Sequence, residues 1–278
     1  KCFFGYHGLE CHHTRRSIPR SNARLHRMIG PMADTGALFL IAVGPFVGSF
    51  IVTLAIRWPE GPSILTGRSA CRSCTARLAW FDLIPVLSWV VRRGCCGSCA
   101  APIGPMYPLT ELVALAIGIW AATQFGGKDL LLACFLGWTL LALAVIDLRT
   151  MLLPDLLTLP LLAVGLFVAA ADGRLAESLI GAALGFAVFA LIATVYRRWR
   201  GRDGLGLGDA KLLGAAGAWV GWTGLPSIVL IASLAALVVA MPMVIRVAGR
   251  RDQREIAFGP YLAGATWITV LYGPLVVA

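Results

Sequence analysis

Charged side chains are scarce in this sequence. Asp, Glu, Lys and Arg make up 14% of its 278 residues, compared with about 25% in a typical soluble domain. Hydrophobic residues make up 58%, and apolar runs of about 20 residues, each long enough to cross a bilayer, recur along the chain. These values exclude a soluble globular domain and predict an all-α, polytopic membrane protein.

Histidine is missing from most of the chain, because all four histidines lie within the first 33 residues. A serine or cysteine triad needs a base, which is usually histidine, and zinc proteases use histidine ligands. Both kinds of site are therefore excluded from the rest of the chain. The glycine-rich stretch "GLGLGD" at 204–209 lacks the Gly-Lys-Ser/Thr sequence of a P-loop, which excludes that nucleotide-binding motif.

The first 33 residues are polar and show no apolar period. They hold six Lys or Arg and a single acid, and they lack the apolar stretch and small-residue cleavage site of a signal peptide. We interpret residues 1–33 as a disordered or mis-assigned N-terminal extension, with a natural start at Met28 or Met32. A histidine-rich metal-binding arm is the alternative.

Eight apolar segments are predicted to span the bilayer, although the second and the sixth are short. Sixteen of the eighteen Lys and Arg residues beyond residue 33 lie in or next to the odd-numbered loops. Positively charged loops stay in the cytoplasm, so we expect these loops there and both termini outside. This distribution explains the net charge of +10 without a nucleic-acid partner. The predicted spans are 35–56, 108–124, 129–146, 155–172, 176–196, 210–223, 226–245 and 258–277.

The loop at 57–107 is the only sizeable soluble piece, and it contains two C-x-x-C pairs about twenty residues apart. This spacing matches a four-thiolate zinc site, and a reducing cytoplasm disfavours disulfides. The sequence therefore predicts a small cytoplasmic zinc-binding loop domain stabilised by its metal, with Cys95 as a bystander. Four reduced free cysteines are the alternative. The predicted ligands are Cys71, Cys74, Cys96 and Cys99.

Two acids lie where charge is costly. Asp147 ends the third predicted span and Asp209 begins the sixth, and an ionisable group at membrane depth is a functional candidate. Because both lie at the cytoplasmic edge, the two carboxylates can face each other and share one proton. This predicts aspartic-protease chemistry, in which one carboxylate activates water while the other polarises a peptide carbonyl. A helix N-cap is the alternative for Asp209.

Three residues near the second acid are predicted to support it. Gly206 and Gly208 permit backbone conformations closed to other residues and allow a substrate strand or a neighbouring helix to approach closely. Lys211 either anchors the positively charged side or tunes the charge of Asp209. Asp155, at the start of the fourth span, is expected to cap a helix N-terminus.

Motifs along most of the chain resemble the type IV prepilin peptidase family, also called leader peptidase/N-methyltransferase, among the Gly-x-Gly-Asp membrane aspartic proteases. The resemblance covers about residues 35–275. Its segments are "GSFIVTLAIRWPEG" (48–61), "CRSC…DLIPVLSW…CGSCAAPIGPMYPLTEL" (71–112), "IDLRTMLLPDLLTLPLL" (146–162), "GLGLGDAKLLGAAGAWVGW" (204–222) and "AFGPYLAGA" (257–265).

The resemblance implies an enzyme that cleaves the basic leader of type IV prepilins and type II secretion pseudopilins. The cut follows a glycine at the cytoplasmic face of the bacterial inner membrane. The resemblance also implies that Asp147 and Asp209 are catalytic, that the four cysteines bind structural zinc, and that S-adenosylmethionine methylates the new N-terminus. The expected domains are the first span with the zinc loop and methyltransferase region (34–107) and the transmembrane aspartic peptidase domain (108–278).

Two other classes stay open from the sequence. A proton-coupled transporter would relay protons through intramembrane acids, but it predicts acids at mid-membrane and an inverted repeat of spans, and the sequence shows neither. A noncatalytic pilus-assembly factor would keep its function after loss of either aspartate. The expected partners are the lipid bilayer and a prepilin or pseudopilin.

Overall fold

The computed structural model describes residues 35–58, 70–77, 80–201, 206–247 and 256–275. The predicted extension at 1–33 lies outside these residues. Regular structure in the described part is helical, apart from two isolated β-bridges, which confirms the all-α prediction. The elements are α2 (Thr35–Arg57), η4 (Trp80–Leu83), α3 (Leu87–Val91), α4 (Met106–Gln124), α5 (Gly127–Thr150), α6 (Asp155–Ala171), α7 (Leu175–Arg200), α8 (Leu207–Val247) and α9 (Gly259–Tyr272).

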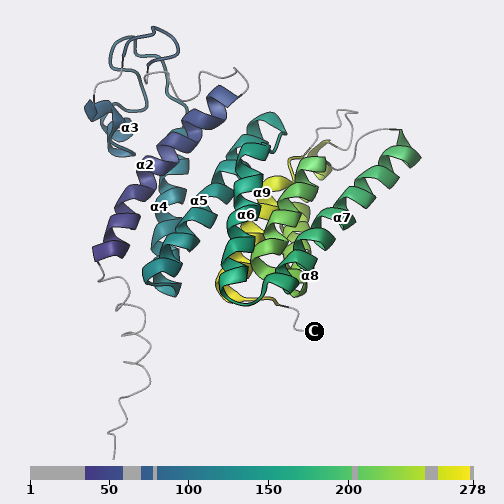
Figure 1. Ribbon diagram of the computed structural model, residues 1–278. Helices are drawn as coiled ribbons and strands as arrows, with labels where there is room; N and C mark the ends of the chain where they lie inside the picture. Colours follow the sequence, from purple (N-terminus) through teal and green to yellow (C-terminus); the bar gives the residue numbers. More distant parts are fainter. Residues whose placement is uncertain (1–34, 59–69, 78–79, 202–205, 248–255, 276–278) are drawn as a thin grey trace, which may run out of the picture.

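The helices form two groups that meet at α5 and α9 (Figure 1). Helices α2 and α4 pack against each other and against α5, whereas α6, α7 and α9 pack against α8. Glycines allow the closest contacts, since a Cβ on Gly48 of α2 would lie 2.6 Å from the Cα of Glu111 in α4. A Cβ on Gly181 of α7 would lie 2.6 Å from the carbonyl oxygen of Gly217 in α8. Small residues let membrane helices approach in this way.

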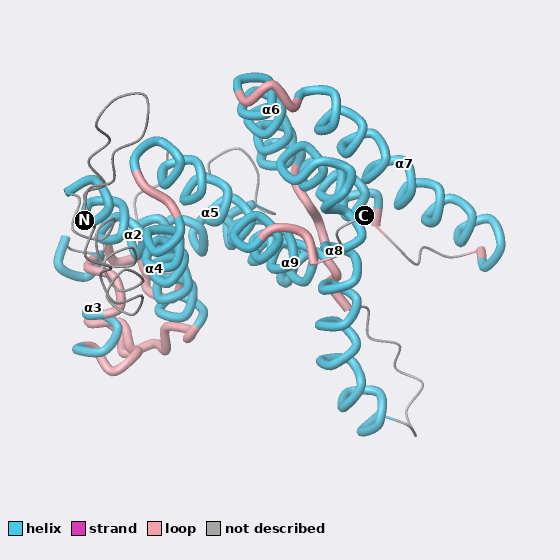
Figure 2. Tube along the Cα trace, turned by 90° about the horizontal axis from the view of Figure 1, so that it is seen from below, coloured by secondary structure: helices cyan, strands magenta, loops and turns pink. Residues whose placement is uncertain are grey.

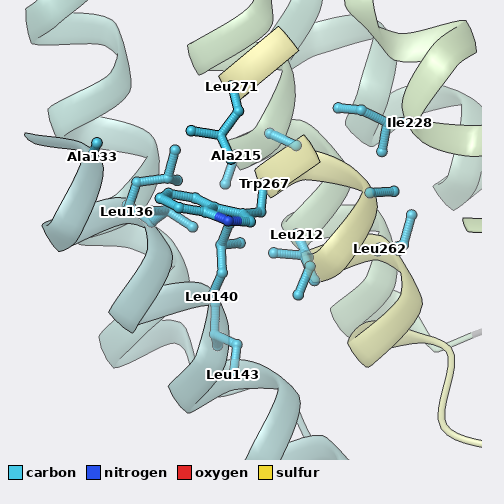
Figure 3. Packing of buried hydrophobic residues seen from close by; sticks show 14 of the residues in the cluster. Ala133, Leu136, Leu140, Leu143, Leu212, Ala215, Ile228, Leu262, Trp267 and Leu271 are labelled. Carbon is cyan, nitrogen blue, oxygen red and sulfur yellow. The ribbon is translucent and has the colours of Figure 1, made fainter. Parts of the chain in front are cut away.

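The hydrophobic core lies where α5, α8 and α9 meet. The indole of Trp267, on α9, packs beside Leu136 and Leu140 of α5 (Figure 3). Leu212 of α8 and Leu262 of α9 are completely buried in the same cluster. This packing fixes the ends of three helices relative to one another, and the candidate site is built from those ends.

The eight predicted spans correspond to seven helices in the described residues, because α8 covers both the sixth and the seventh. Within α8, Gly221 has φ 71° and ψ −179°, which glycine adopts readily, so two helical segments follow each other without a connecting loop. Part of α8 runs away from the other helices (Figure 2). Five described helices are long and apolar enough to cross a membrane, while α6 and α9 have 17 and 14 residues. A multi-pass membrane protein is confirmed, but the count of about eight spans is not.

Basic side chains gather at one end of the bundle. The last turns of α2, α5 and α7 carry Arg57, Arg149 and the trio of Arg197, Arg198 and Arg200. These helix ends point to the same side of the molecule, and the cysteine-containing loop lies on that side too (Figure 1). The described helices therefore show the charge asymmetry that the sequence predicts.

Candidate active site and metal centre

Asp147 lies in the last turn of α5 and is 5% exposed. The helix ends there because Met151 adopts a left-handed conformation, with its N–H bonded to the Asp147 carbonyl at 2.9 Å. The carboxylate oxygen Oδ2 accepts a hydrogen bond from the backbone N–H of Gly259 at 3.0 Å. Gly259 begins α9, so the positive end of that helix dipole faces the carboxylate. Asp147 is thus oriented by a helix from a distant part of the chain.

Gly259 is a residue that the sequence reasoning did not single out. A Cβ at this position would lie 2.6 Å from Asp147 Oδ2, closer than real Cβ atoms come, so only glycine leaves room for the carboxylate. The segment "AFGPYLAGA" does indicate a helix start at this glycine, because Pro260 follows it and proline favours the first turn of a helix. Its link to Asp147 depends on tertiary packing.

Asp209 lies in the first turn of α8 and is 8% exposed. Its backbone N–H bonds the carbonyl of Gly206 at 3.1 Å. Its buried oxygen Oδ1 has no hydrogen-bond partner among the described residues, and the carboxylate is close enough to Asp147 for the two to interact electrostatically. A buried polar atom without a partner is costly, so its position calls for a functional reason.

The glycines before Asp209 act through space rather than through unusual backbone angles. Neither Gly206 nor Gly208 has a positive φ, so the expected conformational freedom is not used. A Cβ on Gly208 would lie 2.9 Å from the Cβ of Leu153, in the segment between α5 and α6. A Cβ on Gly206 would make only an ordinary contact, 3.5 Å from Asp209 Oδ2. Close approach therefore accounts for Gly208, and none of the contacts among the described residues requires Gly206.

Lys211 joins the start of α8 to the start of α6. Its Nζ lies 2.6 and 2.9 Å from the two carboxylate oxygens of Asp155. Pro154 occupies the N-cap position of α6, and no side chain caps that helix, so the capping interpretation of Asp155 is wrong. The position of Asp155 is better explained by its ion pair with Lys211. Lys211 comes from another helix and lies two residues after Asp209.

Exchanging the charges of this pair tests its role. Both side chains are about half exposed, and such pairs contribute about 0–1 kcal/mol, so Lys211→Ala should lower the aspartic-peptidase activity that the sequence predicts less than about tenfold. The double variant Lys211→Asp with Asp155→Lys should recover most of that loss. Initial rates on a detergent-solubilised substrate would measure both effects. A double variant no better than the worse single one would contradict a tethering role.

The four predicted metal ligands come together. The Sγ atoms of Cys71, Cys74, Cys96 and Cys99 all lie within 4.8 Å of one another. Cys71 Sγ and Cys99 Sγ are 3.8 Å apart, and tetrahedral zinc with Zn–S bonds of about 2.3 Å separates its sulfurs by about 3.8 Å. Cys95 is outside the cluster, and its thiol contacts the Arg93 carbonyl at 3.7 Å. The cluster can hold a metal ion.

The two cysteine pairs form matching turns. In the first, the N–H of Cys71 bonds the carbonyl of Ala76 at 2.9 Å, and in the second Cys96 bonds Ala101 at 2.9 Å. A β-bridge closes each turn, and a residue with positive φ follows each second cysteine, Thr75 in one and Ala100 in the other. The loop thus presents two equivalent pairs of sulfur donors to one point.

Backbone amides favour the thiolate form at two of the four cysteines, whereas at Cys99 the Ala101 N–H is outweighed by the neighbouring thiols and burial, which raise the pKa to about 12. The N–H groups of Cys74 and Ser73 lower the pKa of Cys71 to about 6, and those of Ser98 and Cys99 lower the pKa of Cys96. A thiolate is the form that binds metal. The donor set therefore fits zinc in its chemistry as well as in its distances.

A membrane-spanning bundle that buries two neighbouring carboxylates at one end defines a class, the polytopic membrane proteins with a paired-aspartate site. Comparison with known proteins gives the family. Residues 134–241 match the type IV leader peptidase family, and residues 42–125 match the bacterial peptidase A24 N-terminal domain. The chain belongs to the type IV leader peptidase family.

Curated relatives carry the name prepilin leader peptidase/N-methyltransferase. The protein from Aeromonas hydrophila is 40% identical over 214 residues, which cover 76% of this chain and 73% of the relative. The protein from Burkholderia pseudomallei is 37% identical over 280 residues, which cover 88% of this chain and 90% of the relative. No solved structure matches the chain.

Proposed function

We propose that this protein is an aspartic endopeptidase that cleaves the leader peptide of type IV prepilins or type II secretion pseudopilins. The observation that carries the proposal is the buried pair of Asp147 and Asp209, brought together from α5 and α8. The family match over 134–241 includes both aspartates. These findings do not favour a proton-coupled transporter or a noncatalytic assembly factor.

The site suits general acid–base hydrolysis of a peptide bond. The Gly259 N–H holds Asp147 in one orientation, whereas Asp209 Oδ1 has no hydrogen-bond partner in the described part of the chain. Two carboxylates that face each other share one proton, so the charged member takes a proton from the attacking water while the neutral member polarises the scissile carbonyl. The pair titrates as a unit, and its protonation belongs to both residues.

The surroundings suit a substrate that has a basic leader and an apolar helix. Leu148, Leu152 and Leu156, beside the dyad in sequence, are each more than half exposed, so an apolar substrate stem can contact them within the membrane. A cytoplasmic membrane surface attracts basic segments. We therefore place the protein in the bacterial inner membrane, with the cleavage site after a glycine at its cytoplasmic side.

Cleavage by the purified full-length protein tests the peptidase proposal. A prepilin incubated with the solubilised enzyme should lose its leader, and N-terminal sequencing should place the cut directly after glycine. A parallel reaction should contain a zinc chelator. Cleavage is expected to continue there, because aspartic chemistry needs no metal. Absence of cleavage by a well-folded preparation, with either a prepilin or a pseudopilin, would refute the proposal.

The second half of the proposed function is N-methylation of the new N-terminus. The curated relatives are named as N-methyltransferases as well as peptidases, and such an activity uses S-adenosylmethionine as methyl donor. We assign this step to the region formed by the first span and the cysteine loop (34–107), and peptide cleavage to residues 108–278. Structural zinc at the four-cysteine cluster would hold the loop in shape.

Removing one ligand should release the metal. Cys96→Ser is expected to reduce zinc content from one ion per chain to near zero, because structural zinc sites need all four donors and contribute about 10–16 kcal/mol to folding. Cys95→Ser changes the neighbouring thiol outside the cluster and should keep full zinc content. Elemental analysis of the purified variants measures both. Equal zinc loss in the two variants, or none in either, would contradict the assignment.

A further inference from the structure

A cavity separate from the aspartate pair lies between the cysteine loop and the helix ends beside it. Its volume is about 420 Å³, within the range of about 300–1,000 Å³ typical of small-molecule sites. Its walls come from the end of α2, the cysteine loop, the start of α4 and the end of α5, and neither Asp147 nor Asp209 lines it. The peptidase chemistry therefore leaves this cavity without a function.

Glu111 is the buried acid in the wall of this cavity. It lies on α4 and is 5% exposed. Its Oε2 accepts a hydrogen bond from the N–H of Val86 at 2.6 Å, and Ser49 of α2 also hydrogen-bonds the carboxylate. Gly48 lets α2 approach so closely that a Cβ there would lie 2.6 Å from the Cα of Glu111. Three segments thus hold one carboxylate at the cavity.

The contact with Val86 is made at a cost. Val86 has φ 58° and ψ −52°, a conformation that β-branched residues rarely adopt. Backbone strain of this kind clusters at functional sites. A buried carboxylate is costly too unless it is used or paired. A strained backbone at Val86 and a buried carboxylate at Glu111 thus occur together, and together they fix the orientation of that carboxylate.

The other lining groups suit a ligand that carries an aromatic base and a carboxylate. Trp89 supplies an aromatic ring, which its Nε1–H fixes by donating to the carbonyl of Ile103 at 3.1 Å. Guanidinium groups are the usual partners of a carboxylate, and four of them line the cavity, one already paired with Asp82: Arg57, Arg72, Arg92 and Arg149. The donor set therefore fits S-adenosylmethionine, which combines adenine, a methionyl carboxylate and a sulfonium.

The position of the cavity also fits a reaction that follows cleavage. Arg149 lines the cavity and lies two residues after Asp147 on α5. The end of that one helix thus borders both the aspartate pair and the cavity.

We propose that this cavity is the methyl-transfer site and that Glu111 is its general base; this inference rests on the methyltransferase half of the proposed function. Glu111 takes a proton from the α-ammonium group of the cleaved substrate, which frees the nitrogen lone pair. When bound, S-adenosylmethionine supplies an electrophilic methyl carbon, so that the N–C bond forms as the C–S bond breaks and sulfur keeps the electron pair. Glu111 then returns its proton to water.

Replacing Glu111 by Gln tests the base. The amide oxygen of Gln can still accept the Val86 N–H, so the fold contact survives while the proton acceptor is lost. General bases contribute about 10²–10⁴-fold, so methylation should fall at least about a hundredfold while the leader is still removed. Mass spectrometry of the mature N-terminus measures the methylated fraction. Glu177→Gln, the same change at an exposed acid in the first turn of α7, should behave as wild type.

Cofactor binding gives a readout that does not depend on turnover. Equilibrium dialysis with labelled S-adenosylmethionine should show wild-type affinity for Glu111→Gln and about tenfold weaker binding for Trp89→Leu, since stacking of a base on an aromatic ring is worth about 1–3 kcal/mol. Zinc content and leader cleavage of Trp89→Leu would show that the loop has folded.

The outcomes separate the inference from the function on which it rests. If the wild type cleaves and methylates but Glu111→Gln also methylates normally, or Trp89→Leu binds the cofactor as tightly as wild type, the cavity assignment is overturned and the proposed function stands. If the wild type cleaves without ever methylating, the methyltransferase half of the function fails, and the inference fails with it.

Discussion

Asn at either position of the aspartate pair is expected to abolish leader cleavage. Asp147→Asn and Asp209→Asn each remove one of two groups that must exchange a proton, and a positioned acid or base contributes about 10²–10⁴-fold. Since the two carboxylates work as one unit, each single variant should lose at least that much, and the double variant should be little worse than either. Single-turnover cleavage of a purified prepilin measures the loss.

The fold should survive these changes. Asn at 147 keeps an oxygen that can accept the Gly259 N–H, and Asn at 209 leaves the backbone bond to Gly206 in place. Asp129→Asn is a matched control, because Asp129 is an exposed acid in the first turn of the same helix α5. It should cleave as wild type does. Near-normal cleavage by either site variant would refute the paired-acid proposal.

The aspartate pair could be foreseen from the order of the spans alone. Asp147 ends one apolar segment and Asp209 begins another after an even number of further crossings, so both must lie on one side of the membrane. The metal cluster could also be predicted from the sequence. The C-x-x-C spacing selects Cys96 over its neighbour Cys95, and in the structure Cys96 is the one that lies in the cluster. Such patterns are local in sequence or fixed by topology.

Features that depend on packing between distant segments could not be foreseen. Asp155 looks like a helix cap in sequence, and only the approach of α8 to α6 gives it Lys211 as a partner. Glu111 looks like an ordinary acid near a span, and its burial depends on Gly48 of α2. Gly221 lies inside one apolar stretch, and its backbone angles, not its composition, turn α8 there.

The two proposed activities do not separate cleanly at the expected domain boundary. Glu111 lies on α4, beyond the boundary expected at residue 107, yet it faces a cavity walled by the cysteine loop. The end of α5 contributes to that cavity and to the aspartate pair. The two proposed activities therefore use one continuous framework, so a change that shifts the end of α5 should affect both, whereas a change confined to the loop should affect only methylation.

The second large effect is expected at Gly259. In Gly259→Ala the new Cβ would lie 2.6 Å from Asp147 Oδ2, so the carboxylate or the start of α9 must move. A displacement of about 1 Å in a catalytic group can cost about 10²-fold in rate, and we expect a loss of that size in leader cleavage. Zinc content should stay unchanged, because the cysteine loop lies apart from α9.

Gly264→Ala makes the same substitution on the same helix where no atom lies within 4 Å of the added Cβ. It should cleave at the wild-type rate, with α9 stabilised by up to about 1 kcal/mol because Ala favours helix over Gly. Cleavage rates and thermal unfolding of the two variants, measured side by side, separate a local steric effect on Asp147 from a general effect on α9. Equal rates for the two variants would show that Gly259 does not position the carboxylate, and would leave the Asp147 orientation to be explained by the packing of α5 alone.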